Sequence, residues 1–148
     1  MEIKFNNFNV EWIQRIESKI EHAFAIKLTN NELIELGEKL NLDFHYEIHF
    51  DESSAFVRFD CHCKPYGQFS NLTGKEYIDK VGKQCIEVRE KLINQVKNIF
   101  SDYKLKIYKP NYICLLKKDI DLSNIKEGTE KFIAETYENL IKIILKLK

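Results

Sequence analysis

The stretch Cys61-His62-Cys63 puts two thiols and an imidazole in consecutive positions, and such groups bind metal ions or carry redox chemistry. A structural zinc site usually gathers four such ligands from segments where the chain turns. This stretch instead ends a segment of alternating apolar and polar residues, so its successive side chains should point to opposite faces of a strand. We therefore expect Cys61 and Cys63 to pack in the core as small hydrophobic residues, as we do for Cys85 and Cys114.

A neighbouring segment should bring further polar residues beside His62. Alternating patterns predict strands over residues 44–50 and 55–63, joined by a turn at Asp51-Glu52-Ser53-Ser54. Folding about that turn sets apolar residues opposite one another on one face and complementary polar residues on the other. The apolar pairs are Phe44–Cys61, Tyr46–Phe59 and Ile48–Val57, and the polar pairs are Asp43–His62, His45–Asp60 and Glu47–Arg58. A slip of one residue would destroy both sets, so the pattern predicts this register.

Four residues of the polar face form a candidate catalytic or metal site: Asp43, His45, Asp60 and His62. Two imidazoles beside two carboxylates can bind a divalent transition metal or transfer protons near neutral pH. Our preferred interpretation is a solvated strand face whose charges neutralise one another, and a polar binding surface is a further alternative. On the preferred interpretation the chain has no metal, no cofactor and no catalytic residue.

The remaining apolar patterns predict four helices and a second hairpin. The helices cover residues 8–27, 29–39 and 73–100, and a last one is capped by Ser123. The second hairpin turns at Lys109-Pro110-Asn111, with strands near residues 104–108 and 112–117. We therefore predict one α+β domain over residues 1–148, in which a four-stranded antiparallel or mixed sheet packs with three long helices and one short helix.

The second hairpin carries apolar residues on both of its faces. By alternation, one face takes Leu105, Ile107, Cys114 and Leu116, and the other takes Tyr108, Ile113 and Leu115. Either the last helix covers the second face, or that face is an exposed apolar patch of the kind that marks a partner or dimer interface.

Charge and composition narrow the function classes. The chain has 148 residues, with 23 basic and 23 acidic side chains. The zero net charge disfavours sequence-independent binding to the phosphate backbone of nucleic acid. We see no signal peptide and no apolar run of about 20 residues that could span a membrane, so we expect a cytoplasmic protein with reduced thiols. No phosphate-binding loop, dinucleotide fingerprint, nucleophile elbow or H-E-x-x-H motif occurs.

From His45 to Leu147 the layout resembles an uncharacterised α/β domain found C-terminal to restriction-endonuclease-like nucleases. The shared features are a hairpin, a long helix over residues 77–100, a short hairpin over residues 105–116, and the acidic turn Asp119-Ile120-Asp121 before an amphipathic terminal helix. The resemblance covers about two-thirds of the chain and carries no functional residue across. It implies an accessory or binding module, because the nuclease core itself is missing.

We expect a small cytoplasmic non-catalytic binding protein, such as an inhibitor, an immunity protein or a defence-system accessory, with a protein partner and a possible homodimer. The predicted contacts are His49, Arg58, Tyr108, Ile113 and Leu115. The alternative is a metal-dependent hydrolase or nuclease that uses the four-residue cluster above. A third hypothesis is an oligomer that sequesters a nucleotide or another small ligand.

Overall fold

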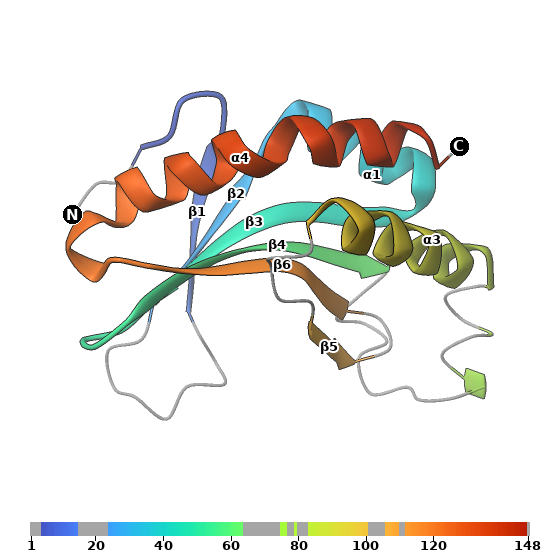
Figure 1. Ribbon diagram of the computed structural model, residues 1–148. Coiled ribbons are helices and arrows are strands. Elements are labelled where there is room, and N and C mark those ends of the chain that lie inside the picture. The colour runs from blue at the N-terminus through green and yellow to red at the C-terminus, as the bar shows by residue number, and fades with distance from the viewer. Residues whose placement is uncertain are drawn as a thin grey trace.

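The computed structural model describes residues 4–14, 24–63, 75–76, 79, 83–100, 106–109 and 112–147. Six strands form one antiparallel sheet in the order β1-β2-β3-β4-β6-β5. The strands are β1 (Asn9–Gln14), β2 (Phe24–Thr29), β3 (Leu42–Phe50), β4 (Ala55–Cys63), β5 (Lys106–Lys109) and β6 (Tyr112–Ile120). Helices α1 (Asn31–Leu40), α3 (Lys83–Ile99) and α4 (Ile125–Leu145) cover one face of the sheet, and a short 3₁₀ helix, η1 (Leu122–Asn124), precedes α4 (Figure 1).

The hydrophobic core lies between the sheet and the three helices. The central strands contribute alternate residues, among them Phe44, Tyr46 and Ile48 of β3, and all three are fully buried. Burying such side chains contributes about 1.5–3 kcal/mol each. The polar end of Tyr46 is satisfied within the core, because its hydroxyl lies 2.9 Å from Thr136 Oγ1, which in turn donates to the Phe132 carbonyl at 2.7 Å. The packing of helices on one face of the sheet confirms the predicted α+β class.

The β3–β4 hairpin has the predicted register at every pair, with Tyr46 opposite Phe59 and His45 opposite Asp60. Its turn is held by Asp51, whose Oδ1 accepts hydrogen bonds from the backbone N–H groups of Ser53 (2.8 Å) and Ser54 (2.9 Å). Because side chains alternate along each strand, this register places every second residue of both strands on the face away from the helices. Cys61 and Cys63 are buried in the core as expected.

The helix predicted over residues 8–27 is wrong. The described parts of that segment are β1 and β2, which pair with each other, and β2 also pairs with β3. Within the described residues the sheet therefore has six strands rather than the four predicted. The apolar residues of this segment recur at steps of three and four residues, which suggested a helix. Val10 and Trp12 also follow a step of two residues, which suits a strand. Aromatic and β-branched residues favour strands, and pairing with β3 supplies the backbone hydrogen bonds.

Helix caps differ in detail from the sequence prediction. Asn30, not Thr29, caps α1, with its Oδ1 accepting from the Leu33 N–H at 2.8 Å. Ser123 does not cap the last helix, because Asp121 Oδ1 accepts from the Ser123 N–H at 2.9 Å and begins η1 instead. The predicted start of the long helix near residue 73 lies outside the described residues, whereas its end at Ile99 agrees with the prediction.

A β-bulge corrects the predicted faces of the second hairpin. Phe59 pairs with Leu116 and Asp60 with Cys114, so Leu115 is an extra residue on β6. The irregularity breaks the strict alternation of side chains, and Leu115 and Leu116 therefore both belong to the core cluster. Cys114 is buried beside Asp60 instead of sharing a face with Leu116. The hairpin itself is confirmed, although β6 runs on to Ile120.

No described helix is both long enough and apolar enough to cross a membrane.

Candidate metal centre on the sheet

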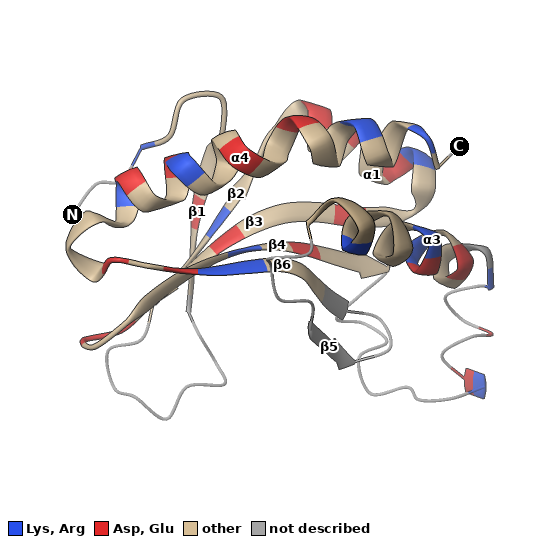
Figure 2. Ribbon diagram, in the orientation of Figure 1, with Lys and Arg blue, Asp and Glu red and all other residues tan. Residues whose placement is uncertain are grey.

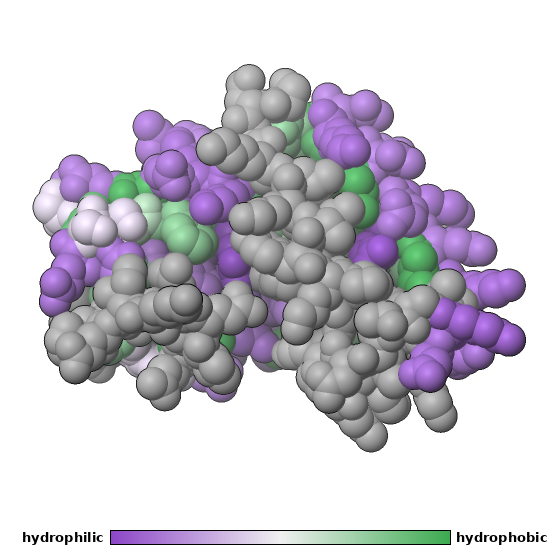
Figure 3. Space-filling model, turned by 90° about the horizontal axis from the view of Figure 1, so that it is seen from below, coloured by the Kyte–Doolittle hydropathy of each residue, from purple (hydrophilic) through white to green (hydrophobic). Residues whose placement is uncertain are grey.

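Polar residues of β3 and β4 gather on the sheet face away from the helices. Figure 3 views the molecule from below, away from α4, and most of the described side chains visible there are hydrophilic. At the centre of this face the side chains are nevertheless buried: Asp60 is 0% exposed, His45 2%, His49 6% and Glu47 8%. Burying ionisable groups is costly unless they are paired, so their contacts decide what the cluster can do.

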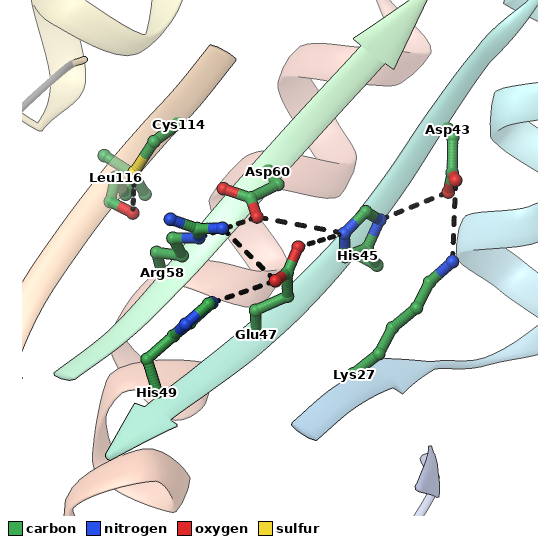
Figure 4. Close-up of polar contacts among 9 residues, drawn as sticks. All are labelled: Lys27, Asp43, His45, Glu47, His49, Arg58, Asp60, Cys114 and Leu116. Atoms are coloured by element: carbon green, nitrogen blue, oxygen red, sulfur yellow. Dashed lines mark hydrogen bonds and ion pairs between the residues drawn. The ribbon is translucent and has the colours of Figure 1, made fainter. Parts of the chain in front are cut away.

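Glu47 is the hub of the cluster (Figure 4). Its Oε2 lies 2.7 Å from His45 Nε2. Its Oε1 accepts from His49 Nε2 at 2.9 Å and from Arg58 Nη2 at 3.2 Å. The two oxygens therefore have different roles, since Oε1 is held by outer partners while Oε2 faces the imidazole of His45.

His45 lies between carboxylates on both sides. Its Nδ1 is 3.3 Å from Asp43 Oδ1, and its Nε2 is 3.8 Å from Asp60 Oδ2. Asp60 Oδ2 accepts from Arg58 Nε at 2.9 Å, and Lys27 Nζ lies 3.6 Å from Asp43 Oδ2. His62 completes the group, with its ring stacked on that of His45 at a centroid distance of 5.2 Å and an interplanar angle of 12°.

The pKa values follow from these contacts. Burial opposes protonation of His45, but its hydrogen bonds to Asp43 and Glu47 prevail and raise its pKa from 6.5 to about 9. Burial and the positive charge of His45 lower the pKa of His62 to about 3, so His62 is neutral near pH 7. Burial and the charge of Glu47 raise the pKa of Asp60 well above its usual range. The pKa of Glu47 is lowered, because its hydrogen bonds from His45 and His49 outweigh its burial.

The donor set fits a divalent transition metal. His45, Glu47, Asp60 and His62 each offer one nitrogen or oxygen atom, and these four atoms all lie within 4.8 Å of one another. A tetrahedral ion with bonds of about 2.0–2.1 Å separates its ligand atoms by about 3.4 Å. The distances from His45 Nε2 to Glu47 Oε2 (2.7 Å) and to Asp60 Oδ2 (3.8 Å) bracket that value. Binding therefore requires a contraction of about 1.4 Å from the 4.8 Å limit to the tetrahedral separation, and loss of the proton on His45 Nε2.

The surrounding contacts would orient these ligands. A metal-binding histidine generally donates its other ring N–H to a carboxylate, which is the relation of His45 Nδ1 to Asp43. His49 and Arg58 occupy the outer oxygen of Glu47 and leave Oε2 directed at the centre. Sequence reasoning brought Asp43, His45, Asp60 and His62 together correctly. It left Glu47 out of the candidate cluster, although Glu47 continues the same two-residue alternation as His45.

Three of the five predicted partner contacts are largely buried. His49 and Leu115 are buried, and the Arg58 side chain is 11% exposed. Tyr108 lies on β5 and Ile113 on β6, and both side chains lie outside the described part of the chain. All four cysteines are buried free thiols, and burial raises the pKa of Cys61 above its usual range and that of Cys114 to about 12. These thiols are poor nucleophiles and metal ligands in this state.

Comparison of the chain with protein-family models, with curated proteins and with solved structures gives no match. The resemblance of pattern to a domain attached to nucleases stays a prediction.

Proposed function

We propose that the protein binds one divalent transition metal ion on the sheet face and uses it for hydrolysis. The ligands are His45 Nε2, Glu47 Oε2, an oxygen of Asp60 and a ring nitrogen of His62. The observation that carries the proposal is that one ligand atom from each of these four residues lies within 4.8 Å of the others in a largely buried cluster. A tetrahedral ion with four protein ligands has no open position, so hydrolysis would require a water as a fifth ligand, whose pKa the ion would lower to about 7 to supply a hydroxide nucleophile.

Charge supports a cation at this position. The three carboxylates of Asp43, Glu47 and Asp60 exceed by one the permanent cations with which they form ion pairs among the described residues, Lys27 and Arg58. Without a metal, a proton on His45 makes up this deficit of one charge, and burial beside Glu47 favours a further proton on Asp60, in line with their raised pKa values. A metal ion would take the place of these protons, because ligands must be deprotonated to bind it.

The proposal is tested by native mass spectrometry of protein loaded with zinc and then passed through a desalting column. We expect one zinc ion per chain in the wild type and its loss in His62→Gln, which removes a ligand. His49→Gln is the matched control, since the glutamine amide can still donate to Glu47 Oε1 and no ligand is lost. Equal zinc retention by wild type and His62→Gln would contradict the site.

The hydrolytic step has its own test. Zinc-loaded wild type should hydrolyse bis(p-nitrophenyl) phosphate, and chelation or His62→Gln should abolish the reaction. If the wild type retains zinc but hydrolyses neither this substrate nor a carboxylic ester, the ion has only a structural role. The buried positions of His49 and Leu115 weaken the earlier expectation of a partner surface built from those side chains.

A further inference from the structure

A groove lies on the helix side of the sheet, separate from the metal centre. It is bounded by the turn before β1, the first residues of α1 and the middle of α4, and its volume is about 840 Å³. Ligand sites for small molecules usually measure about 300–1,000 Å³. The metal ligands point to the opposite face of the sheet, so the groove requires an explanation of its own.

The base of the groove is apolar and held in place. The ring of Phe8 packs edge-on against Tyr46 at 5.9 Å and against Tyr137 at 5.6 Å. The Tyr137 hydroxyl accepts from Asn30 Nδ2 at 2.9 Å and donates to Glu32. These contacts tie α1 and α4 together across one wall, so the groove does not depend on a ligand for its shape.

The walls carry hydrogen-bond acceptors and negative charge. Glu32 lies on one side, on α1, while Glu130 and Glu138 lie on α4, and the described lining residues include no lysine, arginine or histidine. Figure 2 shows acidic residues along α4. Glu130 and Glu138 form ion pairs with lysines on α4, at 3.8 and 3.6 Å, but these pairs are exposed and contribute little. Anionic ligands are therefore disfavoured.

We propose that this groove binds an aliphatic diamine or polyamine. An ammonium group has three N–H donors and no acceptor, which matches carboxylate and carboxamide oxygens on the walls. The rings of Phe8 and Tyr137 can stabilise a cation and pack against methylene groups. Carboxylates on both α1 and α4 favour a ligand with two separated charges over a single ammonium ion. This inference does not rest on the metal centre.

The probe is 1,7-diaminoheptane, with 1,7-heptanediol as an uncharged analogue of the same length, and binding is followed by calorimetry. We expect the diamine to bind and the diol not to bind. Glu130→Gln/Glu138→Gln should weaken the diamine at least tenfold. Glu87→Gln/Glu127→Gln, which removes the same charge from exposed positions outside the groove, should leave binding unchanged.

The proposal would be overturned by absence of diamine binding to the wild type, by equal binding of diamine and diol, or by equal weakening in both double variants. Binding of acetyl-trilysine amide without binding of the diamine would also overturn it, in favour of a peptide ligand. Retention of diamine binding by His62→Gln separates this groove from the metal centre, and its loss there would contradict the separation.

Discussion

In metal-free protein, His45 should make stability fall as the pH rises above neutrality. Its pKa is 6.5 in an unfolded chain and about 9 in the folded one, and the difference corresponds to about 3 kcal/mol. Because the folded pKa is the higher of the two, this stabilisation is complete below pH 6.5 and is lost as the pH passes 9. Between pH 6.5 and pH 8 the loss should be about 1.5 kcal/mol.

The assay is urea unfolding in a chelating buffer, followed by far-ultraviolet circular dichroism at several pH values. His45→Gln is the reference, because its amide can still donate to Glu47 but does not titrate. The buried thiols act in the same direction above about pH 8, since burial raises the pKa of Cys61 and Cys114, and the comparison with His45→Gln cancels their effect. A wild type whose stability, relative to His45→Gln, is constant or rises from pH 6.5 to pH 8 would refute the proposed ion pairing of His45.

Two further predictions concern α1 and are read by thermal or urea unfolding. Gly37→Ala should destabilise the fold by about 2 kcal/mol, because the added Cβ would collide with the backbone carbonyl of Leu42, although alanine normally favours a helix interior; unchanged or increased stability would contradict that close approach. Asn30→Ala should cost about 1 kcal/mol through loss of the N-cap, and Asn30→Asp, which keeps the capping oxygen, should lose less. Equal losses in the two Asn30 variants would show that the bond to Tyr137, not the cap, is what matters.

The hairpin that carries the candidate site could be predicted from the sequence because two independent patterns agreed on one register. Apolar pairs such as Tyr46–Phe59 and polar pairs such as His45–Asp60 both require it, and the structure has it. The clustering of two imidazoles and two carboxylates follows directly from this register. What the sequence could not supply is the burial of these groups and the central position of Glu47, because both depend on neighbouring strands and on Arg58.

Two failures have a common physical origin in strand pairing. Residues 8–27 carry an apolar spacing that suits a helix, yet the pairing of β2 with β3 decides the outcome. Cys114 was assigned to the wrong face because a bulge at Leu115 interrupts the alternation, and a bulge is set by the partner strand β4. The sequence pattern of a segment therefore predicted its structure correctly where pairing with neighbouring strands favoured the same structure. It failed where pairing between strands distant in the sequence favoured a different one.

The most direct test of the metal centre is X-ray absorption spectroscopy of the zinc-loaded protein. The account predicts nitrogen and oxygen ligands at about 2.0–2.1 Å, with the multiple-scattering signal of two imidazoles and no sulfur. His62→Gln should remove one imidazole from that signal, while His49→Gln should leave it unchanged. Sulfur at about 2.3 Å would place the ion at the cysteines, and a spectrum without imidazole would contradict the proposed centre.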